Sequence, residues 1–124
     1  MLLFKKKFLE AIRSGKKTQT IRLWPYRRMR PGQRSYIPGA GYIEVGAVDE
    51  VTLADLTDDD AQPDGFASAD ALRAEIALLY QDQLSAGHHA FRICFRLLPP
   101  EEQALAKAAK REARVRANDG KVGS

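Results

Sequence analysis

The chain is 124 residues long, with 44% hydrophobic residues, 29% charged residues and a net charge of +4. This length fits one globular domain, and the composition is not that of a disordered chain. The single cysteine, Cys94, excludes an internal disulfide, and the chain has no spaced Cys/His pairs of the kind that hold structural zinc. No apolar run approaches the roughly 20 residues that cross a bilayer, so we expect a soluble cytoplasmic protein without membrane contact.

Charge is divided unevenly along the chain. Residues 1–36 carry eleven basic residues and one acidic, whereas residues 37–82 carry one basic and eleven acidic. The basic segment contains a run of four arginines among aromatic residues: Arg27, Arg28, Arg30 and Arg34. Such a run suits RNA, through phosphate contacts and base stacking. A solvated basic face, neutralised by the acidic middle of the same fold, explains the pattern equally well, and both readings stay open.

The first half of the chain predicts one helix followed by strands. Phe4, Phe8 and Ile12 recur at helical spacing, and Gly15 suits the left-handed position after a helix end. Alternation of polar and apolar residues follows, interrupted by turns rich in Pro and Gly. We expect a helix over residues 5–14 and strands over 18–23, 34–37 and 42–51.

The second half predicts short helices, a last strand and a charged tail. Thr57 and Asp60 have the spacing of a capping box, and Ser68 can cap a helix over residues 69–80. Residues 91–97 alternate as a strand, and residues 101–116 are rich in Ala, Lys, Arg and Glu. We expect an α+β fold, a small mixed β-barrel with flanking helices. The domain would span residues 1–98, with an appended charged helix and tail at 99–124.

The segment GKKTQTIR at residues 15–22 carries the residues best suited to chemistry. A phosphate-binding loop is excluded, because the upstream glycine is missing and the segment runs from helix to strand. A hydroxyl, a lysine and a carboxylate can instead perform acyl transfer if they converge. Lys17 and Thr20 are three residues apart, so they can meet only if Lys17 lies in the turn before the strand or a bulge intervenes. Ordinary strand-forming threonines and solvated lysines are the alternative interpretation.

Five segments carry a distinctive combined pattern: GKKTQTIRLW at 15–24, PGQ at 31–33, VDEVTLADLT at 48–57, DAQPDGF at 60–66 and FRICF at 91–95. Together they resemble the ASCH family over residues 4–97, whose fold is similar to the PUA domain of RNA-modifying enzymes. The resemblance implies a small β-barrel with a cleft along its first strand. One branch of the family removes the acyl group from N4-acetylcytidine with a lysine, a threonine and a glutamate.

By its motif, the resemblance places these catalytic roles on Lys17, Thr20 and Asp64. The last is a departure, because aspartate is one methylene shorter than the family's glutamate. Three further residues are expected to bind the nucleoside: Gln19, Arg22 and Trp24. Two alternatives stay open, because Arg22 can instead pair with an acid such as Asp64, and a tryptophan at a strand end is more often part of the core. The resemblance implies no metal and no other cofactor.

Two other functions stay open. The basic segments favour a non-catalytic RNA-binding module that uses the arginine run, and a ribonuclease is a weaker third possibility. Cytosine deamination is excluded, because its zinc-binding His-x-Glu and Cys-x-x-Cys pattern is missing. The oligomeric state and the preferred acyl group do not follow from the sequence.

Overall fold

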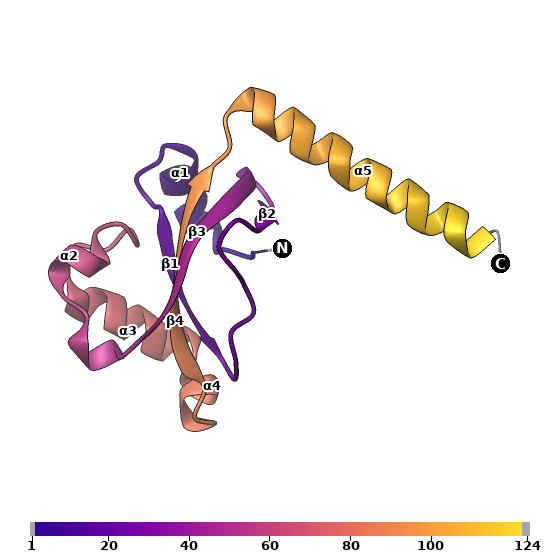
Figure 1. Ribbon diagram of the computed structural model, residues 1–124. Helices are drawn as coiled ribbons and strands as arrows, with labels where there is room; N and C mark the ends of the chain where they lie inside the picture. The colour runs from indigo at the N-terminus through magenta and orange to yellow at the C-terminus, as the bar shows by residue number, and fades with distance from the viewer. Residues whose placement is uncertain (1, 123–124) are drawn as a thin grey trace.

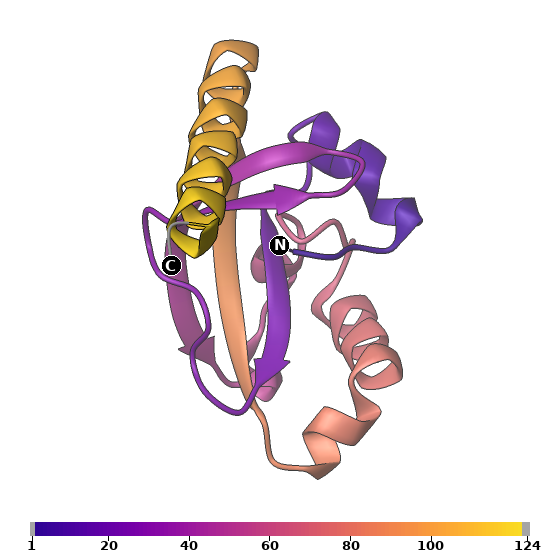
Figure 2. The same ribbon diagram turned by 90° about the vertical axis from the view of Figure 1, so that its right-hand side faces the viewer.

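Four antiparallel strands form the centre of the molecule in a computed structural model that describes residues 2–122, and their side chains up to residue 117 (Figure 1). The strands are β1 (Gln19–Trp24), β2 (Arg34–Ile37), β3 (Gly41–Val51) and β4 (His89–Leu97), in the order β1-β4-β3-β2. The long strand β3 has a bulge between Val45 and Ala47, which bends it. The sheet therefore curls into half a barrel (Figure 2).

Helices pack beside this sheet and extend from it. They are α1 (Lys6–Arg13), α2 (Asp58–Ala61), α3 (Ala69–Leu79), α4 (Gln81–Ser85) and α5 (Pro100–Val122), with a 3-10 turn at Leu53–Asp55. Thr57 and Asp60 form the expected capping box at the start of α2, and the Ser68 side chain caps α3. The short helix α4 and the 3-10 turn were not predicted, because neither has an apolar stripe long enough to show a period.

Two hydrophobic clusters lie on either side of the strands. Ile12 of α1 packs with Ile93 and Phe95 of β4, whereas Leu72 and Ile76 of α3 pack with the β1 residues Ile21 and Leu23. Because β1 is the edge strand, one of its long sides is not covered by another strand. The helices α1 and α3 approach that free side.

The expected α+β class is confirmed, and the curled sheet is compatible with the expected small barrel. All three pairs of neighbouring strands in this sheet are antiparallel. The appended helix is also present, although it continues to Val122 rather than ending near Arg116. Between residues 2 and 122, no helix combines the length and the hydropathy that a bilayer crossing needs.

Ile93 provides a test of the core. Its side chain is fully buried where β4 crosses the centre of the sheet. We expect Ile93→Ala to lower the free energy of unfolding by about 2–4 kcal/mol, because it removes buried methyl groups and leaves a cavity. Urea denaturation measures this loss. The control Leu78→Ala, at a side chain that is 73% exposed, should change stability by no more than about 0.5 kcal/mol; equal losses would contradict the assigned core.

Candidate functional site

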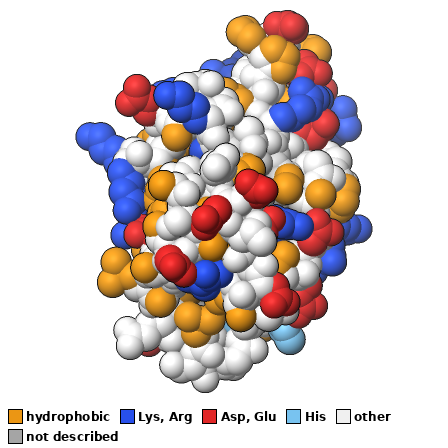
Figure 3. Space-filling view, turned by 90° about the vertical axis from the view of Figure 1, so that its left-hand side faces the viewer, with side chains coloured by type: hydrophobic (Ala, Val, Ile, Leu, Met, Phe, Trp, Pro, Cys, Tyr) orange, Lys and Arg blue, Asp and Glu red, His pale blue; other side chains and the backbone are white. Residues whose placement is uncertain are grey.

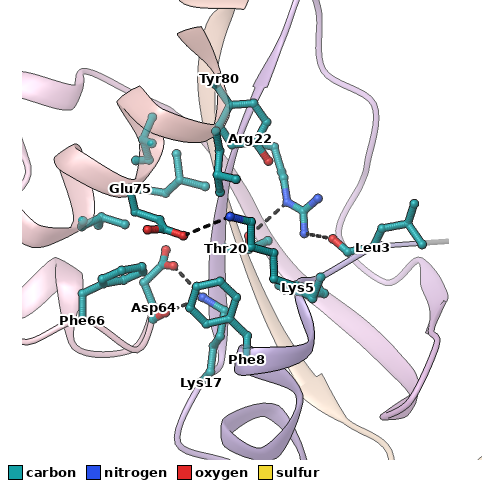
Figure 4. A pocket seen from close by; sticks show the side chains of 15 residues that line it. Leu3, Lys5, Phe8, Lys17, Thr20, Arg22, Asp64, Phe66, Glu75 and Tyr80 are labelled. Carbon is teal, nitrogen blue, oxygen red and sulfur yellow. Dashed lines mark hydrogen bonds and ion pairs between the residues drawn. The ribbon is translucent and has the colours of Figure 1, made fainter.

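A cavity of about 350 Å³ lies against the free side of β1, between α1 and α3. Apolar and aromatic side chains form much of its walls, and polar groups lie among them (Figure 4). This combination is typical of sites for small molecules. The polar lining residues are Lys5, Lys17, Thr20, Arg22, Asp64, Glu75 and Tyr80.

Lys17 and Asp64 form a buried ion pair at one wall of this cavity. Lys17 lies in the turn between α1 and β1, because Gly15 ends the helix with a φ of +79° and the Lys17 amide then bonds back to Ala11. The Lys17 Nζ donates a hydrogen bond of 2.6 Å to Asp64 Oδ1 and another to the Asp64 backbone carbonyl. Their side chains are only 2% and 4% exposed, so each charge depends on the other for compensation.

Aromatic rings surround the lysine ammonium. Lys17 Nζ lies 4.9 Å from the ring centre of Phe8 and 5.8 Å from those of Phe4 and Phe66. This apolar surrounding removes water, and the desolvation lowers the pKa of Lys17 below its ordinary 10.5, although the charge and hydrogen bond of Asp64 act in the opposite direction. A lysine of lowered pKa can serve as a proton acceptor.

The loop that carries Asp64 is attached to the segment that carries Lys17. The Thr18 amide donates to the Pro63 carbonyl over 2.8 Å, and the Gln19 side-chain amide donates to Asp64 Oδ2 over 3.3 Å. Gly65 adopts a φ of +94°, which turns the chain directly after the carboxylate. Both carboxylate oxygens of Asp64 therefore accept hydrogen bonds, one from Lys17 and one from Gln19. The aspartate reaches Lys17 although its side chain is one methylene shorter than that of glutamate.

Thr20 follows on the same strand and has a different partner. Its hydroxyl accepts a hydrogen bond of 3.0 Å from Arg22 Nε, while Arg22 Nη2 donates to the Leu3 carbonyl over 2.8 Å. Arg22 also stacks over Phe4, with 4.6 Å between its guanidinium carbon and the ring centre. The arginine thus fixes the position of the Thr20 oxygen and brings a positive charge beside it.

Glu75 was not recognised in the sequence. It lies on α3 with its carboxylate toward the cavity, 2.9 Å from Lys7 Nζ and 3.9 Å from Lys5 Nζ (Figure 4). A signal was present, because Glu75 stands three residues after Leu72 and one before Ile76 on the apolar stripe of α3. An acid on such a stripe is typical of a site rather than of a core.

The structure brings together four of the six residues predicted for the site. Lys17, Thr20, Arg22 and Asp64 line one cavity, and Gln19 lies behind them, bonded to Asp64. Trp24 does not line the cavity and packs on Phe91 instead, with 5.7 Å between the ring centres.

The predicted arginine run is partly used within the fold. Arg27 donates to the Val48 carbonyl, and Arg34 pairs with Glu44 at 3.6 Å. Arg28 lies over the Tyr26 ring, and Arg30 is exposed. As a result, the run does not present four free guanidinium groups on one surface.

No protein-family model matches the chain, and no curated protein gives a significant sequence match. Solved structures of similar fold include the following two. The hypothetical protein PH0355 superposes with a TM-score of 0.64 at 16% identity, covering 77% of this chain and 95% of that one. Protein EF3133 from Enterococcus faecalis V583, of family DUF984, gives 0.63 at 16% identity, covering 74% and 67%. At this identity the likeness shows the fold alone.

The ion pair makes Asp64 a sensitive position for stability. We expect Asp64→Asn to lower the free energy of unfolding by about 3–5 kcal/mol at neutral pH, because Lys17 loses its only buried counter-charge among the described residues. Lys17 has its ordinary pKa of 10.5 in the unfolded chain and a lower pKa in the folded one. At pH values between these two pKa values, the unfolded chain therefore binds more protons than the folded one. The variant should therefore regain stability as pH rises through that window.

Urea denaturation at several pH values measures this effect, with the exposed neighbour Asp59→Asn as the matched control. A loss for Asp64→Asn no larger than the control, or one that grows with pH, would contradict the buried pair.

Proposed function

We propose that the chain is an ASCH-type, PUA-like domain that hydrolyses the amide of N4-acylcytidine nucleosides, with Thr20 as nucleophile and Lys17 as general base. One observation carries the proposal: Lys17, Thr20 and Asp64, which the family resemblance singled out, line a single cavity. The apolar and aromatic walls of that cavity suit a pyrimidine ring and its acyl group. The two solved structures of similar fold neither favour nor oppose this activity.

The first half of the reaction transfers the acyl group to the enzyme. Neutral Lys17 takes the hydroxyl proton of Thr20 while the Thr20 oxygen attacks the acyl carbonyl carbon. The tetrahedral intermediate collapses as the C–N bond breaks, and the Lys17 ammonium returns the proton to the departing exocyclic amine. Cytidine leaves, and the acyl group remains as an ester on Thr20.

The second half restores the enzyme. A water molecule attacks the ester carbonyl, Lys17 takes a proton from that water, and the Thr20 oxygen leaves and recovers a proton from Lys17. The products are cytidine and the free carboxylic acid. Asp64, which holds the lysine nitrogen at the cavity wall, would keep it in place through both halves.

Two groups are suited to stabilise the negative oxygen of the intermediates. Arg22 brings its guanidinium to the Thr20 oxygen. The Phe95 amide donates to the Thr18 carbonyl, and hydrogen-bonded residues alternate along an antiparallel pair, so Thr20 directs its backbone groups toward β4. The amide of Ile21, one residue later, therefore points away from β4. A backbone N–H on the free side of an edge strand can bind an oxyanion. Gln19 supports Asp64, and a contact between Trp24 and the nucleoside stays a prediction.

Incubation with N4-acetylcytidine, followed by ultraviolet absorbance and product analysis, tests the activity. The wild-type chain should release cytidine and acetate in equal amounts. Thr20→Val keeps the shape but removes the nucleophile, so we expect turnover to fall by at least about 1,000-fold. Thr18→Val, at an exposed threonine two residues away, should keep the wild-type rate. A wild-type chain without turnover, or equal rates for both variants, contradicts the proposal.

The pH dependence tests the role of Lys17. The base must be neutral, so kcat/KM should rise with pH and reach its plateau below 10.5, because burial lowers the pKa of Lys17. Lys17→Arg keeps a positive charge for Asp64 but cannot give up its proton, and we expect a loss of about 100-fold or more. A variant that retains both the rate and the rising limb would show that another group is the base.

A further inference from the structure

A second concave surface lies on a different part of the molecule, between the β2–β3 hairpin and α5. Its main groove has a volume of about 490 Å³ and adjoins a smaller hollow of about 160 Å³. The two share no lining residue with the cavity at β1. The groove and the hollow, which we call the α5 groove, are lined by Tyr36, Tyr42, Gln103, Ala104, Lys107, Lys110, Arg111 and Arg114.

A single side chain fixes the start of α5 against the sheet. Gln103 accepts a hydrogen bond of 2.8 Å from the Tyr42 amide and donates to the carbonyls of Tyr42 and Leu98. Gly41 makes this close approach possible, since a Cβ there would lie 2.9 Å from the Gln103 side-chain oxygen. Beyond this attachment the helix leaves the body of the molecule (Figures 1 and 2). One side of α5 therefore faces the hairpin across an open groove.

The side of α5 that faces the groove carries a stripe of positive charge. Lys110, Arg111 and Arg114 lie three, four and seven residues after Lys107, so the four cations share one side of the helix and span about 10 Å along its axis. Neither hollow has an acidic lining residue within the described part of the chain. The nearby acid Glu112 pairs instead with Arg116, at 3.6 Å.

Two tyrosines form the opposite wall of the groove. Tyr36 and Tyr42 stand opposite each other in the β2–β3 ladder, and their rings meet edge to face with 5.1 Å between centres. Both are partly exposed. An aromatic surface beside a row of cations is the arrangement with which proteins bind unpaired bases and their phosphates.

We propose that the α5 groove binds single-stranded nucleic acid, with the cations of α5 on the phosphates and the tyrosines against the bases. A second copy that docks groove to groove is disfavoured as the occupant, because it would bring two identical positive stripes together. The face that carries α2 and α3 differs from the α5 groove in its charge pattern, because acidic, basic and hydrophobic side chains are interspersed on it (Figure 3). The proposal is independent of the amidohydrolase activity and relocates the expected RNA contact from the arginine run to α5.

Fluorescence anisotropy with labelled 12-nucleotide oligo(U) and oligo(dT), at several salt concentrations, tests the groove in the full chain. With four cations, the slope of log affinity against log salt should be about −3 for a single strand. The groove variant Lys107→Gln, Lys110→Gln, Arg114→Gln should reduce the slope by about 2 and weaken binding at least about 10-fold. The oligo(U) and oligo(dT) arms show whether RNA or DNA is preferred.

The control variant removes the same charge from three exposed positions outside the groove: Lys16→Gln, Arg28→Gln and Arg30→Gln. It should keep at least half of the wild-type affinity, and circular dichroism should show both variants folded. Tyr36→Ala with Tyr42→Ala should weaken binding without changing the salt slope, because stacking releases no counterions.

The single strands should also bind more tightly than a 12-base-pair duplex, although the duplex has the higher charge density. The proposal is overturned if the wild-type chain does not bind, or if both charge variants lose affinity equally. Equal binding of poly-glutamate, or of the duplex, would assign the groove to acidic partners in general and would likewise overturn it.

Discussion

The ion pair between Lys17 and Asp64 is the constraint on which the rest of the site depends. An ammonium group between phenyl rings is unstable without an anion beside it, so the loop with Asp64 must return to the turn before β1. The Thr18 amide and the Gln19 side chain hold that loop in place. The same burial that makes the pair costly lowers the pKa of the lysine, which is the property that a general base requires. Stability and proposed chemistry thus have one physical origin.

The position of β1 at the edge of the sheet gives this pair access to a ligand. A central strand would be covered on both long sides, whereas β1 pairs only with β4, and α1 and α3 leave a cavity at its free side. Consecutive residues of β1 can then contribute to the same cavity, as Thr20 and Ile21 do. The opposite edge of the sheet ends in the β2–β3 hairpin, and α5 stands over that end. The two concave surfaces therefore belong to opposite ends of one curled sheet.

The elements with a strong local signal were predictable from the sequence. Periodicity located α1, α3 and all four strands, and the Thr57 and Ser68 caps located the starts of two helices. The placement of individual side chains at the cavity was predictable only where a motif named them, as for Lys17, Thr20 and Asp64. The position of Glu75 in the cavity depends on how α3 packs against β1, and the course of α5 depends on the contacts of Gln103 with Tyr42, which no local pattern encodes. The role of Gln19 is likewise tertiary, because its partner lies 45 residues away.

The most direct test is a titration of the Lys17 side-chain nitrogen by nuclear magnetic resonance, in the wild-type chain and in Asp64→Asn, with Lys17→Met identifying the signal. A desolvated ammonium that Asp64 partly stabilises should titrate below 10.5 in the wild type and lower still in the variant, because the variant removes the charge that raises the pKa. A Lys17 that titrates at or above 10.5, or whose pKa does not fall when Asp64 is neutralised, would contradict the account.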